Sequence, residues 1–149
     1  EMEMWYATDA PAPSAFTGGQ LLTADADAQV QAWLADRGLA STAGWALCYS
    51  SLNGDDKSNP STWHAQCDGH ARTVVVGTNQ HGYVFGGYAS SAWNDPSSGW
   101  VEEDGGHFIF RLAGPGLGAE AWDDTGSSTY FQYNDADYWP RFGGTARRS

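Results

Sequence analysis

The strongest constraint on the fold is a pair of apolar segments joined by a short turn. Residues 73–78 contain three consecutive valines, and residues 83–85 read Tyr-Val-Phe after a four-residue turn. β-Branched and aromatic residues favour strands, and so short a connection predicts a hairpin. Gly86 and Gly87 follow within the second strand, where glycine indicates a bulge or the close approach of another backbone. An antiparallel sheet is therefore expected in the middle of the chain.

The other segments predict further strands and two helices. A helix is expected over residues 24–37, because Thr23 can cap it and Val30, Trp33 and Leu34 form one apolar stripe. A short second helix is predicted over residues 60–66, and further strands over residues 45–50, 107–112 and 130–133.

This order predicts a mixed α/β fold dominated by β structure. A helix, a strand and a second, short helix are followed by strands only, which suits a two-sheet antiparallel β-sandwich with one or two flanking helices. Residues 1–20 include an Ala-Pro-Ala-Pro segment and are predicted to form an extended leader or linker. The folded domain is then expected to occupy residues 21–149.

The charge balance excludes some classes of partner. The chain has 18 acidic and 7 basic residues, for a net charge of -11. Binding to nucleic acid or to an anionic membrane surface depends on clustered Lys and Arg, so neither is expected. An acidic chain suits a basic partner, a cation or simple solubility. No apolar run approaches the length of a membrane span.

Residues 82–90 read Gly-Tyr-Val-Phe-Gly-Gly-Tyr-Ala-Ser, and residues 64–68 form a His-x-x-Cys-Asp segment. With the flanking segments in the same order, they resemble the TLDc domain family, and the His-x-x-Cys-Asp segment is similar to that of its protist members. The resemblance covers roughly residues 20–144. The residues that carry the motif are Trp45, Trp63, Gly82, Phe85, Gly86, Gly87, Trp93, Phe110, Gly143 and Gly144.

The resemblance implies a β-sandwich with helices alongside, and a role without chemistry of its own. Members of the family are known for protection against oxidative stress, and several bind the vacuolar proton-pumping ATPase. The family has no agreed catalytic residues to carry over, so a non-catalytic protein-interaction or scaffold module is expected. The family domain normally continues past Gly144, so we expect either a shortened domain or strands supplied by a protein partner.

Cys48 and Cys67 leave two interpretations open. They can form one disulfide, or they can remain two buried thiols that behave as small hydrophobic side chains. A disulfide is favoured because both cysteines fall near the same predicted elements. Disulfides persist in oxidising compartments, so the expected location leans towards extracellular or secretory, with cytosolic as the alternative.

Other residues suggest alternative functions. Trp100, Trp122 and Trp139 lie beside turn residues and are candidates for stacking on sugars, which would make the chain a secreted glycan-binding or assembly-forming module. Calcium has weak candidate ligands, and turn-forming acids are the alternative explanation of that cluster: Asn134, Asp135 and Asp137. A hydrolase is the last alternative, because the sequence has no Gly-x-Ser-x-Gly motif.

Overall fold

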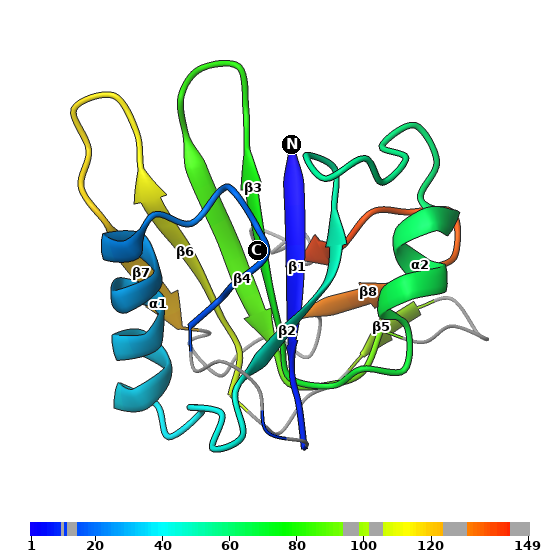
Figure 1. Ribbon diagram of the computed structural model, residues 1–149, viewed down its shortest axis with the longest axis horizontal. Helices are drawn as coiled ribbons and strands as arrows, with labels where there is room; N and C mark the ends of the chain where they lie inside the picture. Colours follow the sequence, from blue (N-terminus) through cyan, green and yellow to red (C-terminus); the bar gives the residue numbers. More distant parts are fainter. Residues whose placement is uncertain (10, 12–14, 94–98, 102–105, 124–130, 144–149) are drawn as a thin grey trace, which may run out of the picture.

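The chain folds into two antiparallel sheets and two helices (Figure 1). The computed structural model describes residues 1–9, 11, 15–93, 99–101, 106–123 and 131–143. Its elements are β1 (Met2–Ala7), α1 (Ala24–Asp36), β2 (Trp45–Ser50), α2 (Ser61–Cys67), β3 (Thr73–Thr78), β4 (Val84–Ala89), β5 (Gly99–Val101), β6 (Phe108–Ala113), β7 (Glu120–Asp123), β8 (Gln132–Asn134) and β9 (Arg141–Phe142).

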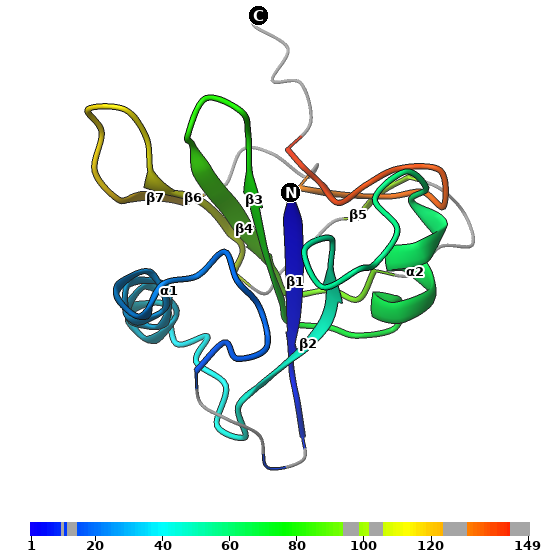
Figure 2. The same cartoon turned by 45° about the horizontal axis from the view of Figure 1, so that its top comes forward.

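A six-stranded sheet, in the order β2-β1-β3-β4-β6-β7, divides the molecule into two halves. Helix α1 covers one face, and helix α2 lies on the other side together with the small sheet β5-β8-β9 (Figure 2). Successive residues of β3 show the division, because Val74 and Val76 contact the α1 side whereas Val75 contacts the α2 side. The predicted class, an antiparallel two-sheet fold with flanking helices, is confirmed.

Each face of the large sheet has its own aromatic core. On the α1 side, Val30 and Leu34 of the helix pack with buried rings that include Trp5, Phe108 and Phe110. The core of the α2 side is built around buried residues of strands, helix and loop: Met4, Tyr49, Trp63, Cys67, Val75, Ala89 and Trp93. Because a ring buries a large apolar area, a few rings suffice to fill both layers.

The segment Met2–Ala7 differs from its prediction as part of a leader. It forms β1, which pairs with β2 on one side and β3 on the other, so it is a central strand of the large sheet. Glu3 makes this buried strand difficult to recognise from the sequence, because a charge in the middle of a strand normally marks a solvent-exposed position. Here the Glu3 side chain is buried, and its carboxylate accepts hydrogen bonds from Gln20 N, Leu21 N and Ser50 Oγ.

Gly86 marks the close approach that the sequence predicts. A Cβ atom at this position would overlap the carbonyl oxygen of Val75 and lie 2.7 Å from Cζ of Phe110. The neighbouring Gly87 faces the other layer, where an added Cβ would meet the ring of Phe142 at 3.0 Å. The two glycines therefore let both layers approach strand β4.

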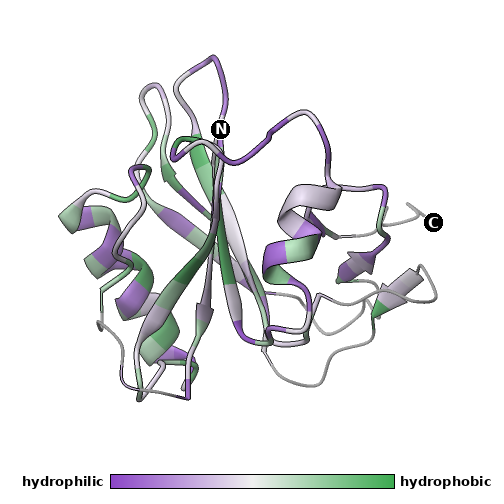
Figure 3. Cartoon of the chain, turned by 45° about the vertical axis from the view of Figure 1, so that its right-hand side comes forward, coloured by the Kyte–Doolittle hydropathy of each residue, from purple (hydrophilic) through white to green (hydrophobic). Residues whose placement is uncertain are grey.

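Polar residues are prominent in the described chain outside the two cores. The loop between β2 and α2 is strongly hydrophilic (Figure 3). Its Asp55 accepts hydrogen bonds from the backbone of Ser50 and from Gln66 Nε2, so it ties the end of β2 to α2. Neither helix in the described part of the chain is long and apolar enough to cross a membrane.

Candidate interaction surfaces

Three large apolar side chains lie exposed on adjacent strands at one side of the large sheet. Phe85 of β4, Ile109 of β6 and Trp122 of β7 are 46%, 43% and 39% exposed. The strand register places Ile109 directly opposite Trp122 on one side and Gly87 on the other. We call the surface made by Phe85, Ile109 and Trp122 the β4–β7 face. It lies opposite the face that α1 covers, because the alternate residues Phe108 and Phe110 contact α1's core.

The cover that the small sheet provides on this side ends beside the β4–β7 face. Phe142 of β9 packs over Gly87, at the same level of β4 as the pairing with Ile109. Phe85, two residues earlier on the same side of the strand, is left exposed. The inner part of this sheet face therefore forms core, while its outer part is an apolar surface.

Arg111 lies within the β4–β7 face, directly opposite Phe85 on β4 and Glu120 on β7. Its guanidinium donates to Glu120 Oε2 at 2.9 Å and to the carbonyl oxygen of Gly118 at 3.1 Å. The same group lies 5.3 Å from the ring centroid of Trp122, within the range of a cation–π contact. The hydrogen bonds hold Arg111 in place, and the cation–π contact joins it to Trp122 while that ring stays exposed.

Strand β7 is the outermost strand of the large sheet next to this face. No described strand pairs with its outer edge. Arg37, at the end of α1, anchors β7 through a two-point contact with Asp123 and lies 4.4 Å from the ring centroid of Phe108. A strand held in place with one free edge can accept a further strand.

A second exposed cluster lies on the small sheet. Trp100 pairs with Tyr133, and Tyr133 pairs with Arg141, so the three residues form a row across β5, β8 and β9. The Tyr138 ring, 48% exposed, joins the row, with its centroid 5.9 Å from that of Tyr133. We call these four residues the Arg141 cluster.

The three tryptophans predicted to bind ligands do not lie together. Trp100 belongs to the Arg141 cluster, and Trp122 belongs to the β4–β7 face. Trp139 is partly buried against the core of the α2 side, with its ring centroid 5.8 Å from that of Tyr49. The structure therefore offers no single sugar-stacking platform made of these three rings.

The motif residues from the sequence are mostly structural. Trp45, Trp63 and Trp93 are each 1% exposed, and Phe110 is buried. Gly82 and Gly143 adopt positive φ angles of 79° and 77°, which glycine tolerates best. Gly86 and Gly87 admit their neighbours, Gly144 lies outside the described residues, and Phe85 is exposed on the β4–β7 face.

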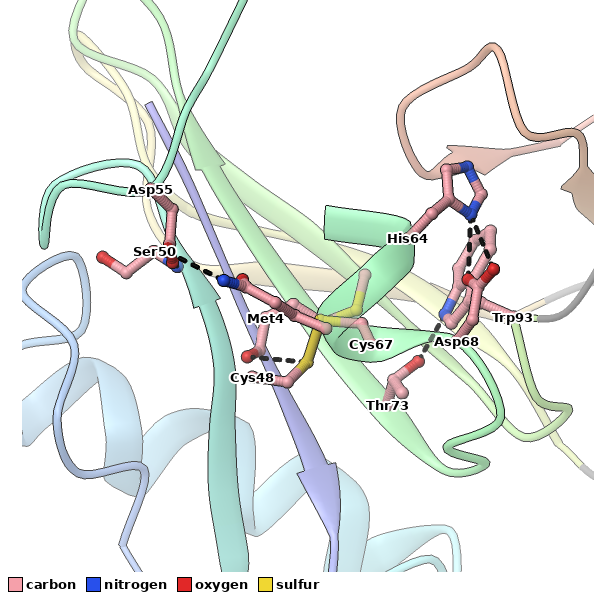
Figure 4. Close-up of a disulfide and its surroundings, with 10 residues drawn as sticks. Met4, Cys48, Ser50, Asp55, His64, Cys67, Asp68, Thr73 and Trp93 are labelled. Atoms are coloured by element: carbon pink, nitrogen blue, oxygen red, sulfur yellow. Dashed lines mark hydrogen bonds and ion pairs between the residues drawn. A yellow bond between two sulfur atoms is a disulfide. The ribbon is translucent and has the colours of Figure 1, made fainter. Parts of the chain in front are cut away.

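Cys48 and Cys67 form a disulfide that joins β2 to α2 (Figure 4). Their Cα atoms are 5.4 Å apart, so the alternative of two free thiols is wrong. One turn earlier on α2, His64 contacts the carboxylate of Asp68 at 2.8 Å and the carbonyl oxygen of Tyr138 at 3.0 Å. The helix thus links the edge of the large sheet to the loop that carries Tyr138.

The predicted calcium ligands do not converge. Asn134 is buried, and its Oδ1 accepts a hydrogen bond from Gln132 Nε2 at 2.9 Å. Asp135 instead accepts from the backbone N of Asp137 at 3.0 Å, which is a turn-forming contact. The described residues include no group of three or more His, Cys, Asp or Glu side chains arranged to hold a metal.

A cavity of about 310 Å³ lies between the start of α1 and the ends of β4 and β6. Most of its lining residues are apolar, and the few polar ones do not form a recognisable catalytic arrangement. The lining residues are Leu21, Thr23, Asp25, Ala26, Gln29, Val84, Leu112, Ala113 and Ala119.

The shifted pKa values have local structural causes. A hydrogen bond from Lys57 contributes most to lowering the pKa of Glu1 to about 2. Burial raises the pKa of Tyr49, and hydrogen bonds from Ser58 lower the pKa of Asp56. Catalytic groups are often recognised by shifted pKa values in a cleft. These three groups lie instead around the start of β1 and the end of β2, and none of them is a member of the β4–β7 face or of the Arg141 cluster.

Sequence patterns single out Phe85 and Trp122 for separate reasons, but they do not predict that the two side chains share a surface. One signal was available, because residues 108–110 are Phe-Ile-Phe and a strand with consecutive large apolar residues is apolar on both faces. No local sequence pattern indicates the contacts of Arg141, since its neighbours come from two other strands and a loop.

A family model for the TLDc domain matches residues 16–148, nearly the whole chain. No curated protein and no solved structure matches it.

Proposed function

Because the chain belongs to the TLDc domain family, we propose that it is a non-catalytic protein-interaction module that docks its partner on the β4–β7 face. The observation that carries this proposal is the exposure of Phe85, Ile109 and Trp122 together, on three adjacent strands. Large apolar side chains scattered singly on a surface need no explanation, but several exposed on three adjacent strands, together with a polar side chain, are typical of an interaction site.

The charge of the chain favours a basic partner. A second copy would bring two chains of net charge -11 together, and the resulting repulsion opposes self-association. A basic segment is attracted instead, and complementary charge speeds its encounter with the surface. The outer edge of β7, with which no strand of the described residues pairs, offers backbone hydrogen bonds to such a segment. The proposed occupant is a basic strand that pairs with β7 and covers Ile109 and Trp122 with apolar side chains.

Two strand-forming peptides test this proposal, one alternating Val with Lys and the other alternating Val with Glu. The basic peptide is expected to bind, and Ile109→Asp is expected to weaken its binding about tenfold or more, because a buried unpaired charge is costly. Fluorescence anisotropy of the labelled peptides, at about 0.15 M salt so that weak surface attraction is screened, measures both effects.

Ala28→Asp is the matched control. Ala28 is exposed on α1, and its substitution adds the same negative charge away from the β4–β7 face. This variant is expected to bind the basic peptide as the unaltered protein does. Equal binding of the acidic peptide, or equal behaviour of the two variants, would contradict the proposed docking surface.

A further inference from the structure

The register of the small sheet creates the Arg141 cluster. Because Trp100, Tyr133 and Arg141 are cross-strand neighbours, their side chains project from the same face of β5, β8 and β9. The neighbours of Tyr133 along β8 are Gln132 and Asn134, and both are buried. The face that carries Trp100, Tyr133 and Arg141 is therefore the outer face of the small sheet.

The rings surround the cation of Arg141 as walls. Its Cζ lies 5.8 Å from the ring centroid of Trp100, 5.5 Å from that of Tyr133 and 5.9 Å from that of Tyr138. Neighbouring rings are steeply inclined, at 63° between Trp100 and Tyr133 and at 81° between Tyr133 and Tyr138. A flat glycan platform needs rings that lie side by side, whereas inclined walls around a cation resemble an aromatic cage.

Ring contacts are what hold Arg141 in this position. Within the described residues, its guanidinium makes no hydrogen bond or ion pair, although it has five N–H groups to donate. Arg141 is also exposed, so water reaches these donors. A hydrated guanidinium held by rings alone can be displaced by a cation that gains more from the rings.

We propose that Trp100, Tyr133 and Tyr138 form a binding site for a methylated ammonium group, and that Arg141 occupies this site in the free protein. A trimethylated ammonium has no N–H group to keep hydrated, so it loses little on entering an aromatic cage. The site is independent of the β4–β7 face and adds a second binding activity to the chain.

The charges around the cluster favour a cation. Asp135 and Asp137 lie on the same loop as Tyr138, between β8 and β9, and the chain as a whole is acidic. The nearby positive charge within the described residues belongs to Arg141 itself, which leaves when the ligand enters. Displacement of Arg141 therefore exchanges one cation for another and leaves no buried charge unpaired.

A titration with N-acetyl-trimethyllysine, with N-acetyl-lysine as the unmethylated control, tests the site. We expect the methylated compound to bind about tenfold tighter, and Tyr138→Ala to weaken its binding about tenfold. Arg141→Ala is expected to strengthen binding, since it removes the competing cation. Tyr138→Phe keeps the ring and should bind normally. Perturbation of the Trp100 indole signal in NMR spectra reports occupancy.

Tyr138→Ala keeps the backbone contacts that hold its loop. The loop that carries Tyr138 is held through the carbonyl oxygen of that residue, to which Trp63 and His64 bond, and Tyr138→Ala retains this group. Equal binding of lysine and trimethyllysine, or weaker binding after Arg141→Ala, would overturn the proposal.

Two further titrations identify the kind of ligand and distinguish this site from the β4–β7 face. Choline that binds as tightly as trimethyllysine would assign a free small molecule, whereas tighter binding of a trimethyllysine peptide would assign a modified protein. Ile109→Asp is expected to leave the titration unchanged, so failure of the β4–β7 face and failure of the cage remain distinguishable.

Discussion

Replacing Gly86 with alanine is expected to destabilise the fold by about 3 kcal/mol or more, one of the largest effects of any single methyl group in this chain. The added Cβ would overlap the backbone oxygen of Val75 in the neighbouring strand and press against the ring of Phe110. Neither can move without separating β3 from β4 or disturbing the core under α1, because interiors are close-packed. Urea unfolding followed by circular dichroism measures the change.

Gly77→Ala is the matched control for this prediction. Gly77 lies in β3, paired with Phe85, and an added Cβ there would meet its nearest neighbour, the Glu1 carbonyl oxygen, at an ordinary 3.5 Å. Its effect is expected to stay within about 1 kcal/mol. Comparable losses in the two variants would show that glycine at these positions is not explained by the approach of neighbouring atoms.

Replacing Glu3 with glutamine is expected to cost about 3 kcal/mol, although the two side chains have nearly the same shape. The buried carboxylate accepts hydrogen bonds from Gln20 N at 2.7 Å, Leu21 N at 2.9 Å and Ser50 Oγ at 2.8 Å. Glutamine offers one oxygen, and its NH₂ group would face a donor. Gln20 N also lies 3.0 Å from the second carboxylate oxygen, so one glutamine oxygen could still accept from both backbone N–H groups. The loss then comes from weaker bonds to an uncharged acceptor and from the Ser50 hydroxyl, which would face the NH₂ group.

The loss of stability in Glu3→Gln should be concentrated in the loop before α1. Hydrogen exchange of the amides of Gln20 and Leu21 is predicted to speed up in Glu3→Gln before the rest of the sheet is affected. Glu120→Gln is the control, because Glu120 pairs with Arg111 at the exposed surface, where an ion pair contributes little. A stability of Glu3→Gln within about 1 kcal/mol of the unaltered protein would contradict the role assigned to this carboxylate.

Local patterns predict the elements that have strong local signals. Residues 24–37 were expected to be helical and α1 spans Ala24–Asp36, since a cap and an apolar stripe agree there. The hairpin of β3 and β4 and the glycine contacts within it were predicted for the same reason. Strands β1, β5, β7 and β9 were missed, because Glu3 interrupts the apolar alternation of β1 and because β5, β7 and β9 are short.

The candidate surfaces depend on information that no local pattern holds. Ile109 and Trp122 come together through the pairing of β6 with β7, and Phe85 joins them because β4 is the next strand. Trp100 and Arg141 are 41 positions apart, and β8 alone brings them into one row. The sequence predicts which side chains can bind, and the order of strands decides which of them act together.

Photo-cross-linking from the β4–β7 face is the most direct measurement of whether this face docks a partner. A benzophenone side chain at Ile109, in cells that make the protein naturally, is predicted to give one discrete adduct whose contact segment is basic. The same group at Ala28, exposed on α1, is predicted to give none. Equal products from both positions, or an adduct with a second copy of the chain, would contradict the proposed interaction with a basic partner.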